Sequence, residues 1–273
     1  MLRDTLLARL HEMGDAPDYQ RLAAEVLGIR GAPPDLARRL VAQALVMEDR
    51  RDVWRSAGER ICAHAPATPG VYVLRDRDGL ALYVGKAVNL RRRLRAHFAE
   101  RRWRALKPEM SRVADAEWIE VGSELEALLR EADMIHTLQP LVNVQIGPPA
   151  LSTRSVPRAL VRDVVVVVPS VEADSAELVA ARADGGWFIQ RTRRDGADLL
   201  VHTNRLLRVF RSPLPRGVEH APLAPIVFSW LAGRGKQATR LDPRDVSPRV
   251  FRARLAALLR DERLFAERIE QMR

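Results

Sequence analysis

The sequence has a single cysteine, Cys62, among its 273 residues, and no grouping of cysteines and histidines with zinc-ligand spacing. One cysteine excludes an intramolecular disulfide, and the missing CxxC pattern argues against a zinc site. The longest apolar run, Val164–Pro169, is far too short to span a bilayer. The first ten residues include Asp4 and alternate charged with apolar side chains, which is unlike a signal peptide. These absences predict a soluble, cytoplasmic protein with no membrane partner.

Basic residues are in clear excess. The chain has 45 Lys and Arg against 35 Asp and Glu, a net charge of +10 and an isoelectric point near 10.8. The segment from Lys86 to Lys107 holds nine of the basic residues and only one acid, Glu100. A solvated helix face in an arginine-rich chain is the plain explanation, but a run this dense favours nucleic-acid binding.

The chain divides by composition into segments that together predict an α+β protein. Residues 1–62 have helical patterns and are predicted to form a helical module, with a winged-helix DNA-binding arrangement if Val46–Arg55 is a short hairpin. A helical cap packed on the next domain is the alternative. Residues 66–146 alternate strand and helix signals, and a linker is expected at Gly147-Pro148-Pro149. Residues 160–273 are predicted to form a C-terminal α+β region, to which the sequence assigns no role.

Two alternating runs around Asp78-Gly79 predict a β-hairpin, because this dipeptide suits a two-residue type I′ turn. With that turn, the numbers of paired residues sum to 157, so Tyr72 lies opposite Gly85. Tyr72 and Tyr83 then project from one face of the sheet as diagonal neighbours, roughly 7–8 Å apart. Two such tyrosines are more often packing residues, but the missing side chain at Gly85 predicts open space beside them.

A cationic helix is predicted over Asn89–Phe98, with a buried stripe of Leu90, Leu94 and Phe98. Arg93 and His97 lie together on one flank of this stripe, Arg91 and Arg95 lie on the other flank, and Arg92 points away. Helical geometry alone does not choose between Arg93 and Arg95 as a phosphate ligand.

A second helix is predicted over Glu124–Leu138, after a probable edge strand at Glu117–Val121. Its apolar stripe consists of Leu125, Leu128, Leu129, Ala132 and Ile135. Glu131 borders this stripe, and a partly buried acid is costly unless it is paired or bound to a metal. The partner of Glu131 is ordinarily an arginine, and a metal ion is the more specific alternative.

Five short motifs in this order resemble those of the GIY-YIG nucleases. They are Gly70-Val71-Tyr72, Tyr83-Val84-Gly85-Lys86, the Asn89–Leu94 segment with its three arginines, Glu131, and Pro140-Leu-Val-Asn143-Val144. The motifs are most similar to the N-terminal nuclease domain of excinuclease C (UvrC) and its stand-alone homologue Cho, over about 80 of the 273 residues. The family's spacing from Gly85 selects Arg93 over Arg95. Val71 and Val84 replace isoleucines of the family, and His97 stands where UvrC-like proteins often have tyrosine.

The resemblance implies a three-stranded antiparallel sheet flanked by helices and a site that works with one metal ion. In that scheme Glu131 holds Mg²⁺ or Mn²⁺, and Arg93 balances the charge that builds on the phosphate. Tyr72 or Tyr83 directs or deprotonates the attacking water, with Tyr72 preferred. The residues expected to bind substrate are Gly85, Lys86, Arg91, Arg92, Arg95, His97 and Asn143, the last with a sheet-supporting role as its alternative.

The sequence is therefore interpreted as that of a metal-dependent endonuclease that nicks DNA, in repair of the nucleotide-excision type. The expected partners are duplex DNA, damaged or structured, and a repair helicase or damage-recognition protein. Two alternatives stay open: a non-catalytic DNA-binding protein that uses the fold as a platform, and a structure-specific nuclease of DNA or RNA junctions. The presence of Tyr72, Arg93 and Glu131 together favours the nuclease, because a binding platform does not need them.

Overall fold

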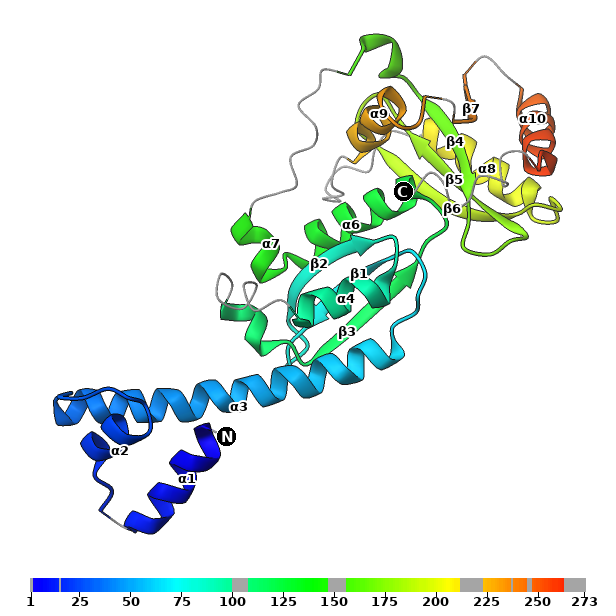
Figure 1. Ribbon diagram of the computed structural model, residues 1–273. Helices are drawn as coiled ribbons and strands as arrows, with labels where there is room; N and C mark the ends of the chain where they lie inside the picture. Colours follow the sequence, from blue (N-terminus) through cyan, green and yellow to red (C-terminus); the bar gives the residue numbers. More distant parts are fainter. Residues whose placement is uncertain are drawn as a thin grey trace.

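The computed structural model describes residues 2–14, 16–99, 108–146, 156–211, 223–236, 238–244 and 247–262 (Figure 1). Helices come first, followed by a three-stranded sheet with its helices and then by a four-stranded sheet with further helices. This is the α+β architecture predicted from the sequence. The predicted linker at 147–149, the basic residues between 101 and 107, and the end of the predicted C-terminal region lie outside the described residues. Within the described ranges, no helix is both long and apolar enough to cross a membrane.

Three helices form the N-terminal part: α1 (Leu2–Met13), α2 (Tyr19–Glu25) and α3 (Pro34–His64). Leu6, Leu22 and Val41 bury a small core where α1 and α2 pack on the first half of α3. The predicted hairpin over Val46–Arg55 is wrong, since α3 continues through it for 31 residues. This stretch contains no proline after Pro34 and a single glycine, so nothing in it ends the helix. A winged-helix arrangement is therefore excluded.

The second half of α3 packs on α4 (Leu90–Ala99) and the short 3₁₀ helix η1 (Pro108–Arg112). The Trp54 ring lies 4.6 Å from the Phe98 ring, and Trp54 Nε1 donates to the Phe98 carbonyl oxygen at 3.3 Å. A Cβ atom at Gly58 would lie 2.7 Å from the Phe98 ring, so only glycine allows the two helices to approach this closely. This half of α3 matches the alternative expectation of a helical cap on the following domain.

The central sheet consists of β1 (Gly70–Arg75), β2 (Ala81–Ala87) and β3 (Asp115–Glu120), all antiparallel in the order β2-β1-β3. Tyr72 pairs with Gly85 and Leu74 pairs with Tyr83, which confirms the predicted register. The third strand lies at an edge of the sheet, as predicted.

The turn of the hairpin differs from the prediction, although the register does not. Asp76 N donates to Leu80 O and Gly79 N donates to Asp76 O, both at 3.1 Å, so the loop has three residues rather than two. Only Gly79 has a positive φ there, at 82°, whereas a type I′ turn needs two such residues. The shift made by the longer loop is cancelled by an irregularity between Leu74 and Arg75, which restores the predicted pairing at the tyrosines.

The two faces of this sheet bury different helices. Tyr72 and Leu74 lie in a core with α3 and α4. Val71, Val73 and Val84 face α6 (Glu124–Leu138), from which Ala127, Met134, Ile135 and Leu138 complete a second core. The observed bounds of α6 are those predicted, with Ser123 as its N-cap and the left-handed Gln139 as its C-cap. A further short helix, α7 (Leu141–Ile146), follows and contacts β2.

The C-terminal sheet has the order β6-β5-β4-β7, with β4 (Val164–Pro169), β5 (Ser175–Ala181), β6 (Trp187–Arg193) and β7 (Arg240–Leu241). The 3₁₀ helix η2 (Arg158–Leu160) precedes it. Helices α8 (Leu199–Arg211) and α10 (Pro248–Arg260) bury one face of this sheet, and α9 (Ala224–Ala232) covers the other. The sequence interpretation missed α9 because prolines surround it. Pro225 stands in its first turn, where proline is tolerated.

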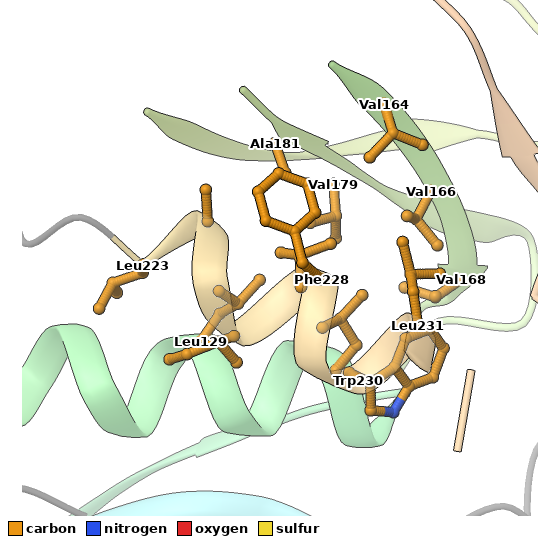
Figure 2. Packing of buried hydrophobic residues seen from close by; sticks show 14 residues of the cluster. Leu129, Val164, Val166, Val168, Val179, Ala181, Leu223, Phe228, Trp230 and Leu231 are labelled. Atoms are coloured by element: carbon orange, nitrogen blue, oxygen red, sulfur yellow. The ribbon is translucent and has the colours of Figure 1, made fainter. Parts of the chain in front are cut away.

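Helix α6 belongs to two cores at once. Its Leu125 and Leu129 pack with α9 and with Val166 and Val179 of the C-terminal sheet, and Leu128 and Ala132 lie against the same cluster. Figure 2 shows α9 between that sheet and α6, with Phe228 among the buried side chains. The apolar stripe predicted for this helix therefore points mainly into the C-terminal unit. A second apolar face, which the sequence interpretation did not identify, contacts the central sheet.

Polar contacts reinforce the junction between the two units. A Cβ atom at Gly122 would lie 2.1 Å from the backbone carbonyl carbon of Ser170, so the two chain segments touch directly. Glu124 accepts from Trp230 Nε1 at 3.3 Å and forms an ion pair with Arg234. Glu126 is fully buried beside Arg130, at 2.8 Å, and its pKa is raised by burial and then by the nearby charge of Glu177.

Candidate active site

Three aromatic rings from three elements meet beside the hairpin. Tyr72 comes from β1, Tyr83 from β2 and His97 from α4. Their ring centroids are 6.0 Å apart for the two tyrosines, 5.7 Å for Tyr72 and His97, and 5.8 Å for Tyr83 and His97. The Tyr72 hydroxyl is hydrogen-bonded to His97 Nε2. The predicted common face of the two tyrosines is thus confirmed, and His97 joins them.

The three side chains differ in how far they are exposed to solvent. Tyr72 is 0% exposed and His97 is 2% exposed, whereas Tyr83 is only partly buried. A Cβ atom at Gly85 would lie 2.7 Å from the Tyr72 hydroxyl oxygen and 2.8 Å from the Tyr83 ring. The predicted open space beside Tyr72 is therefore wrong: the phenol itself fills it. Gly85 is needed here because the tyrosines pack directly over its backbone.

The environment keeps the histidine neutral and the phenols protonated near pH 7. Burial, and then the charge of Arg93, lowers the pKa of His97 to about 4. Burial raises the pKa of both Tyr72 and Tyr83 above the usual value for tyrosine, and Arg93 opposes this shift. A neutral imidazole has one donor and one acceptor nitrogen, so in the tautomer protonated at Nδ1 the Tyr72 hydroxyl donates a hydrogen bond to Nε2.

The structure separates Arg93 from Arg95, which the helical pattern alone did not. The Arg93 guanidinium acts on Tyr72 and Tyr83 through its charge and through side-chain hydrogen bonds. The charge of Arg95 acts instead on Cys62, on the adjacent helix α3. Arg93 is therefore the one of the two that acts on the tyrosines, and Arg95 is an exposed side chain on the side of α4 near α3.

Glu131 reaches the site from α6. Its Oε2 lies 2.5 Å from the Lys86 ammonium, and its side chain is 15% exposed. Its negative charge contributes to the raised pKa of both tyrosines, so the carboxylate is close to them. Glu131 is therefore a paired acid, and its partner is a lysine, Lys86, where an arginine was expected. Among the described residues, no group of three or more His, Cys, Asp and Glu gathers to hold a metal.

The side-chain amide of Asn143, on α7, is bonded to the backbone of β2. Its Oδ1 accepts from Val84 N at 2.8 Å, and its Nδ2 donates to Val84 O at 3.0 Å. These are the groups that an edge strand leaves unpaired. Of the two roles expected for Asn143, this geometry matches support of the sheet.

The remaining arginines of α4 differ in their surroundings. Arg91 donates through Nε to the Ala65 carbonyl oxygen at 2.7 Å, which ties α4 to the end of α3. Arg92 is exposed, and its backbone N–H donates to Asn89 Oδ1 at 2.9 Å. The side chains of Arg92 and Arg95 therefore lie at the surface, whereas Arg91 has a structural partner.

The sequence interpretation missed two pairings, between Tyr72 and His97 and between Lys86 and Glu131. The four-residue spacing of Arg93 and His97 was the available signal for the first, because it places both side chains on one flank of α4. The second pairing joins residues 45 positions apart, and no local pattern indicates it.

Comparison with known proteins identifies the segment that carries this site. Residues 68–144 match the family of UvrC-like GIY-YIG domains. With the hairpin, the two tyrosines and the acid on α6 in place, this part of the chain is a GIY-YIG domain. It is related to the N-terminal endonuclease domain of UvrC, as its relatives show.

The curated relatives match less than a third of this chain. UvrABC system protein C of Syntrophus aciditrophicus is 46% identical over 81 residues, covering 29% of this chain and 13% of that protein. The protein of the same name from Moorella thermoacetica is 39% identical over 88 residues, covering 32% of this chain and 14% of that protein. The chain thus spans about one seventh of the length of these relatives.

Among solved structures, the chain is similar to the GIY-YIG N-terminal endonuclease domain of UvrC from Thermotoga maritima, bound to its catalytic magnesium. The identity is 30%, the match covers 32% of this chain and 94% of that one, and the TM-score is 0.28.

The lowered pKa of His97 predicts a pH-dependent stability. The unfolded chain, with a histidine pKa near 6.5, takes up this proton before the folded protein does. The stabilisation is therefore complete above about pH 6.5 and is lost as the pH falls toward 4, by at most about 3 kcal/mol. In His97→Gln this part of the loss should disappear, as measured by urea unfolding at several pH values. Substitution of the exposed His136 by Gln is the control and should keep the wild-type slope. An unchanged slope in His97→Gln would contradict the assignment.

Proposed function

We propose that this protein is a metal-dependent DNA endonuclease that hydrolyses one phosphodiester bond and leaves a single-strand nick, in repair of the nucleotide-excision type. The observation that carries the proposal is the convergence of Arg93 and Glu131 on the same two tyrosines. The two side chains come from α4 and α6, which lie against opposite faces of the central sheet. A mere DNA-binding platform would have no use for this arrangement.

The donor chemistry of the site fits a hard divalent ion. Glu131 offers carboxylate oxygens, and one of them already has a cation beside it, the Lys86 ammonium. A single carboxylate, completed by water and substrate oxygens, suits Mg²⁺ or Mn²⁺. Such an ion, when bound, polarises the phosphate and stabilises the leaving oxygen. The magnesium bound to the related Thermotoga maritima domain supports this choice.

Arg93 is the residue that we assign to the charge of the transition state. Its guanidinium is held by the hydroxyl groups of Tyr72 and Tyr83, so it is oriented before substrate arrives. A preorganised cation costs no reorganisation when charge develops on the non-bridging phosphate oxygens. Lys86 then provides a second positive charge beside Glu131, and the exposed Arg92 and Arg95 provide contacts to more distant phosphates.

Exposure favours Tyr83 over Tyr72 as the phenol that meets the attacking water. Tyr72 is completely buried and its hydroxyl is hydrogen-bonded to His97, whereas Tyr83 is partly exposed. This reverses the preference for Tyr72 that the sequence interpretation expressed. Because its pKa is raised, Tyr83 acts as a neutral phenol whose oxygen accepts a hydrogen bond from the water and orients it. The rings of Tyr72 and His97 pack against Tyr83 and hold it in position.

The other residues expected to bind substrate have supporting roles in this scheme. Gly85 admits the tyrosine rings, Asn143 holds β2, and Arg91 anchors α4 to α3. DNA is the proposed substrate because the domain is UvrC-like and the chain is strongly basic. By the same relationship, a repair helicase or damage-recognition protein is the proposed second partner.

The proposal predicts nicking that depends on both Glu131 and a divalent ion. Supercoiled plasmid and a lesion-bearing duplex would be incubated with Mg²⁺, Mn²⁺ or excess EDTA. Glu131→Gln should lower the rate by roughly 10³-fold or more, since the loss of metal assistance removes several kcal/mol of transition-state stabilisation. Asp133→Asn, on the same helix, is the matched control and should nick normally. Nicking that survives EDTA or Glu131→Gln would refute the mechanism, and cleavage of RNA alone would refute the substrate.

A comparison of two arginines tests the charge assignment. At saturating DNA, Arg93→Ala should lower the single-turnover rate by roughly 10²–10³-fold, the loss typical of one preorganised donor. Arg95→Ala should weaken DNA binding and leave the saturated rate nearly normal. The measurement is the rate of nicking in single turnovers over a range of protein concentrations. Equal rate losses in the two variants at saturation would show that the wrong side of α4 has been assigned.

A further inference from the structure

Helices α8 and α10 form a paired layer on the C-terminal unit. They pack against each other and cover the face of the sheet that is turned away from α9 and α6 (Figure 1). Leu206 of α8 and Phe251 and Leu255 of α10 are fully buried in their common core with Val165. The inner sides of both helices are therefore occupied, and their outer sides face solvent.

The outer sides carry an unusual charge. Both helices together contain seven arginines and no acidic residue. The arginines, called the α8–α10 arginine face below, are Arg205, Arg208, Arg211, Arg249, Arg252, Arg254 and Arg260. All are exposed except Arg252, which is partly exposed. The whole chain has 35 acidic residues for 45 basic ones, so this composition is not its general background.

Other arginines of the same unit have carboxylate partners. Arg182 pairs with Asp184, Arg191 with Glu177 and Glu172, Arg193 with Asp195, and Arg244 with Asp163. Within the described part of the chain, no ion pair reaches any member of the α8–α10 arginine face. Among the described residues, the fold therefore supplies no carboxylate partner for the positive charge of this face.

The position of Arg249 argues against a role in helix stability. Arginines in the last turn, such as Arg208, Arg211 and Arg260, are favoured by the helix dipole. Arg249 is the second residue of α10, in the first turn, where the dipole is positive and a cation costs a few tenths of a kcal/mol. A charge that opposes the dipole in this way is consistent with an anion supplied from outside the protein.

We propose that the α8–α10 arginine face binds the phosphate backbone of duplex DNA, as a second contact surface outside the GIY-YIG domain. Arg205, Arg208 and Arg211 lie three residues apart along one side of α8, a row about 9 Å long. Duplex DNA carries one negative charge per about 1.7 Å of its axis, so a row of this length faces several phosphates. One guanidinium group can donate two parallel hydrogen bonds to the oxygens of a phosphate, and such contacts do not depend on base sequence.

This surface would hold DNA that flanks the nicked bond. It contributes to affinity and not to chemistry, because it lies on a different unit from Glu131 and Arg93. Choosing DNA as the anion rests on the proposed nuclease function. Binding and cleavage are nevertheless measured separately, so one can fail without the other.

The first test measures affinity for a fluorescent duplex in EDTA, where cleavage does not proceed. Arg205→Gln/Arg208→Gln/Arg211→Gln and Arg249→Gln/Arg252→Gln/Arg254→Gln should each weaken binding by roughly tenfold or more. Each should also make the slope of log K against log salt shallower by about 2–3. The matched control, Arg9→Gln/Arg30→Gln/Arg39→Gln in the N-terminal part, removes the same charge and should change affinity less than twofold. At saturating DNA and Mg²⁺, the nicking rate of both α8–α10 variants should stay normal.

The second test uses the unmutated protein, so it does not depend on the folding of any variant. Phenylglyoxal modifies accessible arginines, and mass spectrometry reports the rate at each site. Duplex DNA should slow the modification of Arg205, Arg208 and Arg249 at least threefold, and polyglutamate at equal charge should not. Equal affinity losses in the control triple variant, or no protection by DNA, would overturn the proposal. Protection by polyglutamate alone would also overturn it and would indicate an acidic protein partner. Loss of nicking in every protein, with the affinity differences intact, would refute only the nuclease function.

Discussion

Helix α6 is packed on both of its long sides. Leu125 and Leu129 lie in the core of the C-terminal unit, and Ala127 lies in the core of the GIY-YIG domain. The direct backbone approach at Gly122 fixes the start of the helix against the end of β4. Glu131 extends from this doubly anchored helix, so the position of the proposed metal ligand depends on both units. A carboxylate held in this way loses little conformational freedom when a cation binds.

The tyrosine cluster depends on the missing side chain of Gly85 as much as on contacts between the rings. Because Gly85 has no side chain, the Tyr72 ring packs directly on β2. The Tyr72 hydroxyl is hydrogen-bonded to His97. The buried ring of Tyr72 then supports Tyr83, which keeps contact with solvent. The charge of Arg93 acts on both phenols and lowers the pKa of each, so this arginine lies beside the cluster.

The sequence predicted local features of the central domain well because their signals are local. The register predicted at the tyrosines is correct although the turn is longer than assumed, and the predicted bounds of α6 agree with its observed caps, Ser123 and Gln139. Contacts between distant segments were not predictable in this way. The pairing of Lys86 with Glu131 and the face of α6 that contacts the central sheet both depend on tertiary packing. The error over residues 46–55 had a local origin, since a short amphipathic stretch suits a hairpin or a helix equally well.

The central claim is that α6 joins the two units into one cooperative structure that holds Glu131. Native-state hydrogen exchange of Leu129→Ala tests it most directly, with the exposed Leu200→Ala as control. Loss of the buried Leu129 side chain should lower the opening free energy of amides in β1 and β5 alike, by about 2–5 kcal/mol. The control should change neither strand by more than about 0.5 kcal/mol. A loss confined to β5, with β1 unchanged, would show that the GIY-YIG domain is stable on its own and would contradict the account.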